Sequence, residues 1–240
     1  MTNRSSVVVI PRIDSREDTH LTLKRGLRRL FADEELPHVA HYTDGAPYFP
    51  NRPDLLYSSS DCHCSVALQV APAGLLPVGI DVEDKADQAA RILPRYTTEA
   101  DRRAMANYPQ ISPLELWSAK EAIFKAFSRY VRDFQTDITL LAPGHFAVSR
   151  LGEVSVSYRS GSELSTLSES HHTYPDPLVL AFITAPEVEE RLIVLCRLEP
   201  VVGHHSALLG EALDMLRLPT EEGLRDQKGE VGVADAGLLK

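Results

Sequence analysis

A short apolar segment of the sequence, Val78–Glu83, ends in two carboxylates, Asp81 and Glu83. Residues two apart in a β-strand point to the same side, so a strand over this segment presents both carboxylates on one face. Gly79 has no side chain and lets another backbone or a ligand approach the strand closely. The segment therefore predicts a carboxylate pair that is open to a partner element.

The segment from Leu116 to Tyr130 has the spacing of an amphipathic helix, because its apolar residues recur every three or four positions. Glu121 and Lys125 lie four residues apart on a neighbouring stripe, with Lys120 beside them. A helix packed on the preceding strand would bring Glu121 to the carboxylate pair. The two lysines would then reach any anion bound there.

Three carboxylates suit a hard cation such as magnesium, which keeps several waters and takes the rest of its shell from substrate phosphates. The residues predict a metal site formed by Asp81, Glu83 and Glu121. Each segment also has a plainer explanation. Glu and Lys four residues apart are common on solvated helix faces, and Asp-x-Glu after an apolar run is common where a strand enters a loop.

Together the two segments resemble the two signature blocks of the 4'-phosphopantetheinyl transferase superfamily. Those blocks read Gly-Ile/Val-Asp-x-Glu and Trp/Phe-Ser/Cys/Thr-x-Lys-Glu-Ala/Ser-x-x-Lys, and Gly79–Glu83 and Trp117–Lys125 meet every defining position. Three further stretches are similar to the surfactin-synthetase-activating type of that superfamily: Glu17–Leu23, Gly45–Asp54 and Ser60–Cys62. The resemblance extends from about Arg16 to about Ala185.

The resemblance implies an enzyme that transfers 4'-phosphopantetheine from coenzyme A to a serine of an apo acyl or peptidyl carrier protein. Asp81, Glu83 and Glu121 would hold the magnesium ion that bridges the coenzyme A pyrophosphate. Lys125 and Lys120 would stabilise phosphate charge. Glu121, directly or through a metal-bound water, would accept the proton of the serine hydroxyl.

Two other positions near this site follow from the same resemblance. Glu99 and Asp101 lie near the second candidate base of the family. Trp117 is expected to be a packing residue that orients Lys120 and Glu121.

The same resemblance predicts the residues that contact coenzyme A, which are Pro47, Ser60, Asp61, Lys120, Lys125 and Arg25. Three positions depart from the family pattern, since Leu21, Ala46 and Asp61 stand where the family has basic residues, the last of them a histidine. Losing charge-assisted contacts to a phosphate should weaken the grip on the nucleotide. Replacement cations are available on the first predicted helix at Lys24, Arg25, Arg28 and Arg29, although a solvated basic face explains them equally well.

Two other functions stay open. The first is a homologue with the same fold and weakened coenzyme A binding, repurposed as a biosynthetic-pathway enzyme or a carrier-binding factor. The second is a binding protein with a solvated Asp, Glu and Lys surface. Clustered carboxylates argue against the second, because like charges destabilise a fold unless a cation or a proton offsets them.

Charge and composition limit the partners. The 240 residues carry 25 Lys and Arg against 34 Asp and Glu, a net charge of -9, which argues against nucleic acid as a partner. A basic surface that docks an acidic carrier protein must therefore be local. The sequence has neither an apolar run long enough to cross a bilayer nor a signal-peptide core, so we expect a cytoplasmic protein that does not bind membranes. The resemblance implies a monomer.

The cysteines allow two interpretations. Three cysteines do not form a disulfide framework. Cys62-His63-Cys64 suggests a metal site that His171-His172 or His204-His205 could complete, but no second cysteine pair stands at a zinc-finger or zinc-ribbon spacing. We expect the cysteines to act mainly as small buried residues at the start of a strand.

Hydrophobic periodicity predicts an α+β fold with antiparallel sheet. The expected strands are 6–10, 64–70, 78–83, 137–141, 154–158, 178–184 and 192–198, and the expected helices are 18–35, 84–93, 98–107 and 113–132. The segments 44–54 and 161–177 are expected to be a turn-rich stretch and a mobile loop.

The resemblance implies two pseudo-twofold-related halves, each a helix packed on a small antiparallel sheet. A weak echo between 66–72 and 179–186 agrees with this. We place the halves at 1–90 and 91–200, followed by an extension, 201–240, with a partly disordered tail.

Overall fold

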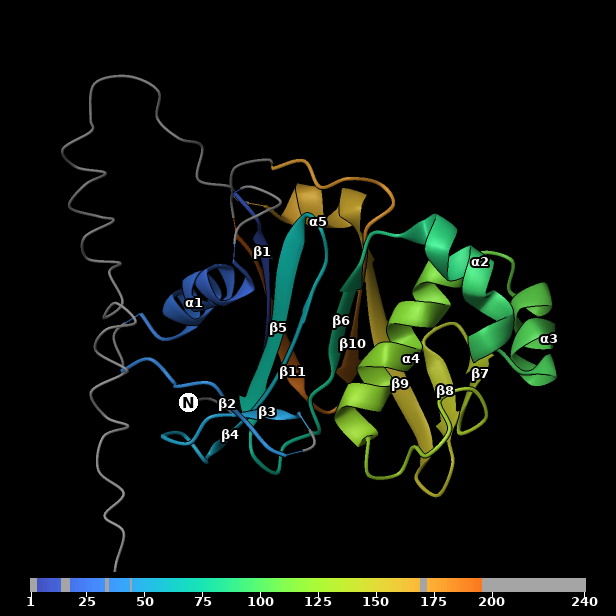
Figure 1. Ribbon diagram of the computed structural model, residues 1–240, viewed down its shortest axis with the longest axis horizontal. Coiled ribbons are helices and arrows are strands. Elements are labelled where there is room, and N and C mark those ends of the chain that lie inside the picture. Colours follow the sequence, from blue (N-terminus) through green and yellow to red (C-terminus); the bar gives the residue numbers. More distant parts are fainter. Residues whose placement is uncertain (1–3, 14–17, 33–34, 44, 169–171, 196–240) are drawn as a thin grey trace, which may run out of the picture. The chain divides into compact units, whose positions relative to one another are not determined.

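The computed structural model describes residues 4–13, 18–32, 35–43, 45–168 and 172–195, all of which lie in the first of two units of the chain, Met1–Leu198. Within these residues are five helices, a four-stranded sheet, a five-stranded sheet and a two-stranded ribbon (Figure 1). The predicted α+β class is confirmed. None of the described helices is both long and apolar enough to cross a membrane. The predicted extension 201–240 lies outside the described residues.

The four-stranded sheet has the order β11-β1-β5-β4. Its strands are β1 (Arg4–Pro11), β4 (Leu55–Asp61), β5 (Ser65–Pro72) and β11 (Glu189–Val194). β5 is antiparallel to both β1 and β4, whereas β11 is parallel to β1. The prediction of purely antiparallel sheet is therefore wrong for this pair, because β11 returns from the far end of the domain rather than through a hairpin.

Helix α1 (Thr19–Leu30) covers one face of this sheet and begins at the cap residue Asp18, whose side chain accepts a hydrogen bond from the His20 amide. It ends at Leu30, shorter than predicted. Leu23 and Leu27 are buried on the face that packs with β1 and β5. An amphipathic stripe thus anchors α1, as its pattern of polar and apolar residues requires.

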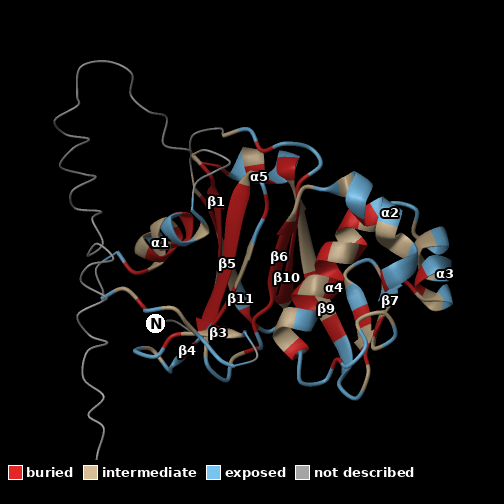
Figure 2. Cartoon of the chain, in the orientation of Figure 1, coloured by how far each residue is buried: buried red, intermediate tan, exposed pale blue. Residues whose placement is uncertain are grey.

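The five-stranded sheet is antiparallel throughout, with the order β6-β10-β9-β8-β7. Its strands are β6 (Ile80–Glu83), β7 (Ile138–Ala142), β8 (His145–Val148), β9 (Gly152–Ser160) and β10 (Val179–Thr184). Helix α4 (Pro113–Phe127) packs across β6 and β10. Figure 2 shows β1 and β5 of the four-stranded sheet and β6 and β10 of the five-stranded sheet as buried for most of their length, and α4 as buried on part of its surface.

The apolar stripe predicted for α4 is largely confirmed. Leu116, Ala119, Ile123 and Phe127 are buried, whereas Tyr130 lies beyond the end of the helix and is exposed. The helix starts with a capping box in which Ser112 and Glu115 each bind the other's backbone amide. Its start and its buried face therefore follow from the local sequence.

Several helices and strands differ from the predictions. Strands β4 and β8 and the ribbon of β2 (Ala40–His41) and β3 (Pro47–Tyr48) were not predicted. Helix α2 (Ala86–Tyr96) continues through Pro94 into its last turn instead of stopping before it. The predicted loop at 161–177 begins as helix α5 (Gly161–Leu167), which has its own capping box at Ser160 and Glu163. Helix α3 (Glu99–Asn107) agrees with the prediction.

Each of the two sheets contains one strand that comes from the other half of the sequence. β6 comes before residue 90 yet pairs with β10, whereas β11 comes from the C-terminal side and pairs with β1. The buried Gln69 of β5 links the sheets, since its amide accepts from the Gly79 amide at 3.0 Å and donates to the Ile183 carbonyl at 2.9 Å. The pseudo-twofold relation and the boundaries 1–90 and 91–200 stay predictions.

Candidate functional site

The carboxylate of Asp81 is the centre of the site. Asp81 lies in β6 and is 6% exposed. Its Oδ1 accepts hydrogen bonds from Ser60 Oγ at 2.7 Å and from Lys125 Nζ at 2.9 Å. Its Oδ2 is buried and has no hydrogen-bond partner among the described residues. Three elements, β4, β6 and α4, therefore meet at one carboxylate, whose second oxygen has no donor among the described residues.

The alternation of β6 sets the direction of this carboxylate. Ile80 and Val82 pack into an apolar cluster with β1 and β5. Since successive residues of a strand point to opposite faces, Asp81 projects toward α4, and Glu83 belongs to the same face. The burial of Ile80 and Val82 agrees with the predicted alternation of this strand.

Gly79 allows α4 to lie directly on the start of β6. A Cβ at Gly79 would lie 2.1 Å from the carbonyl oxygen of Ala122 and 2.8 Å from the Cβ of Ala126. Because of this close approach, Lys125 reaches both Asp81 and the carbonyl of Ile80, the latter at 3.0 Å. Gly79 of the first segment and Lys125 of the second thus both contribute to the contact between β6 and α4.

Glu121 lies one helical turn before Lys125 and shares the electrostatic environment of Asp81. Burial raises the pKa of Glu121, and the negative charges of Asp81 and Glu83 raise it further, against the opposing effect of Lys125. A carboxyl group in this environment holds its proton more tightly than a solvated one. The sequence prediction that α4 brings Glu121 to the carboxylate pair is supported by these interactions.

Glu83 is oriented by the chain that follows it. Its Oε1 accepts hydrogen bonds from the backbone amides of Asp84 at 2.9 Å and Lys85 at 3.1 Å. One carboxylate oxygen is thus engaged at the start of the loop that leads to α2. Neither of these two amides binds the other carboxylate oxygen, Oε2 of Glu83.

The donors suit a hard cation in type and charge, since Asp81 keeps a buried oxygen without a donor and the carboxylates repel one another. The ligand atoms of Asp81, Glu83 and Glu121 do not all lie as close together as ligands around one bound ion would. Among the described residues, the one group of three metal-ligating side chains whose ligand atoms all lie within 4.8 Å of one another is Cys62, Cys64 and Asp84. Asp81, Glu83 and Glu121 do not form such a group, and their role as metal ligands stays a prediction.

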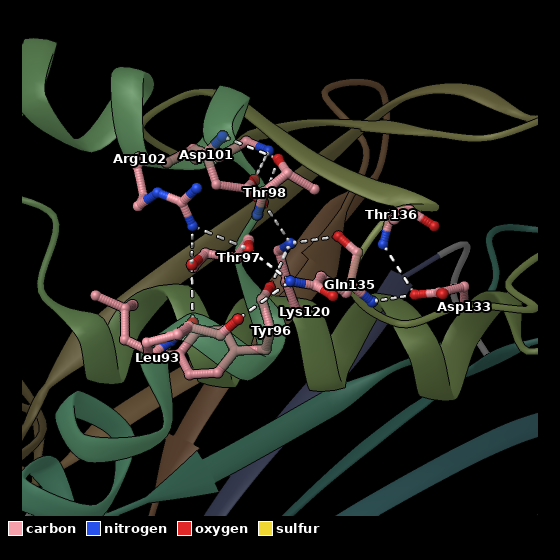
Figure 3. A network of polar contacts seen from close by, with 12 residues as sticks. Leu93, Tyr96, Thr97, Thr98, Asp101, Arg102, Lys120, Asp133, Gln135 and Thr136 are labelled. Carbon is pink, nitrogen blue, oxygen red and sulfur yellow. Dashed lines mark hydrogen bonds and ion pairs between the residues drawn. The ribbon is translucent and has the colours of Figure 1, made fainter.

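Lys120 is not brought to this site. It is 0% exposed, and its Nζ donates to Asp101 Oδ2 at 2.9 Å, to the Tyr96 carbonyl at 2.8 Å and to the Gln135 carbonyl at 3.4 Å (Figure 3). Burial lowers the pKa of Lys120, and the charge of Asp101 opposes that shift. The structure thus gives Lys120 a structural ion pair on a different side of α4 from Lys125.

Neither carboxylate predicted near the second candidate base is free. Asp101 is fully buried, and besides Lys120 it binds the amides of Thr98 at 2.7 Å and Leu140 at 2.8 Å. Glu99 forms a surface ion pair with Arg102 at 3.0 Å. Asp101 therefore holds α3, α4 and β7 together rather than facing the Asp81 cluster.

Trp117 behaves as the packing residue that was predicted. Its ring contacts Tyr96, with centroids 5.0 Å apart, and Phe134, with centroids 5.5 Å apart. These contacts lie near the backbone carbonyl of Tyr96 that binds Lys120. The tryptophan thus supports the helix segment that carries Lys120 and Glu121.

A groove opens beside Lys125, with a volume of about 1020 Å³. It lies along β3, β4 and the last turns of α4, and its lining includes Ala46, Pro47, Tyr48, Phe124, Lys125 and Arg129. Two of the residues predicted to contact coenzyme A, Pro47 and Lys125, therefore face one space. Ser60 is connected to the same region through Asp81.

Asp61 is neutralised by an arginine that the sequence did not single out. Arg12 follows β1, is 8% exposed, and donates to Asp61 Oδ2 at 2.6 Å and to Thr19 Oγ1 at 2.9 Å. The one sequence signal for it is a charged residue directly after a β-branched strand. Arg25 approaches the same end of β1, since its guanidinium donates to the Pro11 carbonyl at 3.4 Å. Leu21 is 41% exposed and supplies no charge.

A family model matches part of the chain. No match to a curated protein was found. The matched segment, residues 77–182, is less than half of the chain and includes both signature segments, from β6 to β10. The α+β architecture described above is compatible with the fold of the matched family. Residues 77–182 match the family model of the 4'-phosphopantetheinyl transferase superfamily.

Proposed function

We propose that this protein transfers 4'-phosphopantetheine from coenzyme A to a serine of an acyl or peptidyl carrier protein, in a magnesium-dependent reaction of the surfactin-synthetase-activating type. The match of residues 77–182 supports phosphopantetheine transfer in general. The observation that carries the proposal is Asp81, whose Oδ1 is bound by Ser60 and Lys125 while its buried Oδ2 has no donor among the described residues.

Asp81, Glu83 and Glu121 would hold the magnesium ion. When bound, the ion would neutralise charge on the pyrophosphate of coenzyme A during bond cleavage. The carboxylates fit this role because they combine oxygen donors with mutual repulsion that a cation relieves.

Lys125 would hold the phosphate next to the pantetheine. Its ammonium group is fixed by Asp81 and the Ile80 carbonyl at the edge of the groove, so it is oriented before the substrate arrives. Preorganised donors of this kind stabilise developing charge without rearranging during the reaction. For Lys120 we propose a positioning role in place of the predicted phosphate contact, because its ammonium is wholly buried.

Glu121 would accept the proton of the carrier serine hydroxyl. The serine oxygen forms a bond to the phosphorus next to pantetheine, and the bond from that phosphorus to the bridging oxygen breaks, releasing adenosine 3',5'-bisphosphate. The supporting observation is its position on α4, beside Asp81 and Glu83 and one helical turn before Lys125, which lines the groove.

Coenzyme A would lie in the groove lined by Ala46, Pro47 and Lys125. Arg12 supports this placement, since its ion pair with Asp61 removes the repulsion between that carboxylate and a phosphate. Arg25 lies near the same end of β1 and is the predicted coenzyme A contact that would replace the missing basic residues if the 3'-phosphate is held.

Intact-protein mass spectrometry tests the proposal. Incubation of the full chain with magnesium, coenzyme A and several apo carrier proteins should add one phosphopantetheine mass to at least one carrier, and removal of magnesium by a chelator should stop it. Asp81→Asn and Glu121→Gln should abolish transfer with unchanged circular dichroism. Glu99→Gln, which removes an exposed carboxylate, is the matched control and should stay active.

The transferase assignment fails if no carrier in a broad set gains mass. Activity that survives both Asp81→Asn and Glu121→Gln would contradict the metal assignment. A loss in Glu99→Gln as large as that in Glu121→Gln would contradict Glu121 as the base.

A second function is favoured by the charge-free positions Ala46 and Leu21 beside the groove and on α1. In this alternative the chain is a homologue with weakened coenzyme A binding, repurposed as a pathway enzyme or a carrier-binding factor.

Calorimetry separates the two functions. We expect coenzyme A and its 3'-dephospho form to bind with similar affinity. Carrier binding with no coenzyme A binding would favour the alternative, and a strong preference for the 3'-phosphate would show that cations such as Arg25 have replaced the missing contacts.

A further inference from the structure

Two cysteines and a carboxylate that the proposed transferase reaction does not use converge near the end of β6. Cys62 Sγ, Cys64 Sγ and a carboxylate oxygen of Asp84 all lie within 4.8 Å of one another. Both thiols are free, and their sulfurs are 3.6 Å apart. Cys62 is buried, while Cys64 and Asp84 are half-buried and reachable from solvent.

The backbone holds these side chains in place from both sides. The turn between β4 and β5 is closed by the Cys62 amide, which donates to the Ser65 carbonyl at 2.9 Å. Arg12 clamps the same turn, because its side chain donates to the Cys62 carbonyl at 3.0 Å and its amide to the Cys64 carbonyl at 2.9 Å. Asp84 is fixed through its amide, which donates to Glu83.

The sulfur spacing matches two ligands of one tetrahedral ion. Two thiolates each about 2.3 Å from a tetrahedral zinc lie roughly 3.8 Å apart. The observed 3.6 Å is close to this value. A disulfide would need sulfurs about 2.05 Å apart and would gain nothing from a neighbouring carboxylate.

We propose that Cys62, Cys64 and Asp84 bind a thiophilic divalent cation of the zinc class. Thiolates are soft ligands that select zinc and similar ions over magnesium, so this site would not compete with the proposed magnesium carboxylates. Binding releases the thiol protons to solvent and places a double positive charge against two thiolates and one carboxylate. With three protein ligands, the fourth position of the ion is left to water or to another donor.

The ion would join two segments that the transferase site also uses. The turn carrying Cys62 and Cys64 follows Ser60 and Asp61, and Asp84 directly follows Glu83. Occupancy would fix the position of β4 relative to the loop after β6. The inference concerns metal binding alone and does not rest on the proposed transferase activity.

Cobalt titration of the full-length, reduced protein tests the site. Cobalt should produce a thiolate-to-metal charge-transfer band at one equivalent, and zinc should displace it. Cys64→Ser and Asp84→Asn, both at half-buried positions, should weaken binding at least about tenfold, since even changes to residues behind metal ligands have effects of that size. Circular dichroism establishes that each variant is folded.

Two variants serve as matched controls. Cys196→Ser removes the third cysteine, which lies outside the described residues, and should keep the band. Asp81→Asn alters the proposed magnesium site and should also keep it, so failure of the transferase proposal is distinguishable from failure of this one. The absence of a band in the wild type, or its loss in Cys196→Ser with retention in Cys64→Ser, would overturn the assignment.

Thiol counting provides an independent readout. The denatured, metal-free protein should show three free thiols, and zinc should protect two of them from modification in the native protein. A count of one free thiol in protein purified without reductant would overturn the metal site in favour of an oxidised Cys62–Cys64 pair.

Discussion

The ammonium of Lys125 lies 2.9 Å from Oδ1 of Asp81, a residue 44 positions earlier in the chain. This contact joins α4 to β6 and depends on Gly79, which leaves room for the helix backbone. The relationship connects the two segments that the sequence analysis singled out. It also leaves Asp81 Oδ2 without a donor among the described residues, which is the feature on which the proposed metal role depends.

Replacing Lys125 by Met should reduce kcat for phosphopantetheine transfer. The change keeps most of the side-chain volume but removes the cation that would face the phosphate. Loss of one preorganised donor typically lowers kcat by about 10²–10³. Steady-state kinetics with coenzyme A and a carrier protein would measure the effect. The exposed Lys85, changed to Met, is the matched control, and an equal loss there would contradict the assignment.

Gly79→Ala should destabilise the fold and separate α4 from β6. The added Cβ would meet the Ala122 carbonyl oxygen at 2.1 Å, and a backbone atom cannot yield as a flexible side chain does. Overpacking of this kind costs about 1–3 kcal/mol of unfolding free energy. Denaturant unfolding would measure it. Gly74→Ala, at a turn with no atom within 4 Å but a φ of +87°, should cost less. Equal costs would contradict the packing role of Gly79.

Lys120→Met should destabilise the protein more than any change to a surface ion pair. It removes the partner of Asp101, which is itself fully buried, and an unpaired buried charge typically costs about 3–5 kcal/mol. The exposed pair of Glu99 and Arg102 provides the comparison, since Arg102→Ala should change stability by about 1 kcal/mol or less. Unfolding curves of both variants would test this, and a small effect of Lys120→Met would mean that water enters the site.

Glu190→Gln should change how stability depends on pH. Burial raises the pKa of Glu190 to about 7, against the opposing charge of Arg159. The folded state then binds more protons than the unfolded state between pH 4.5 and about 7, so the wild type loses unfolding free energy as pH rises through this window. The variant lacks this loss and should gain relative to the wild type toward pH 8.

Urea unfolding between pH 4 and 8 would measure that difference. The exposed Glu187, changed to Gln, controls for the loss of one negative charge. Parallel curves for the wild type and Glu190→Gln would contradict the raised pKa.

Much of the candidate site was predictable because it depends on local stereochemistry. The two-residue repeat of a strand put Asp81 and Glu83 on one face, and the apolar stripe of α4 was read correctly from its spacing. The glycine before Asp81 was expected to permit close approach, and it does. Strands β4 and β8 were missed, because β4 ends in the polar run Ser58–Asp61 without alternation of polar and apolar residues, and β8 has only four residues.

By itself, the sequence determined the residue types, their spacing and the elements that present them. The tertiary structure decided which of them meet. Lys120 and Lys125 are five residues apart, so they project about 140° apart around a helix, and only packing determines which one is buried against Asp101. The pairing of Arg12 with Asp61, and the convergence of Asp84 on two cysteines some 20 residues earlier, likewise depend on which strands become neighbours. Such contacts span long loops, and no local pattern encodes them.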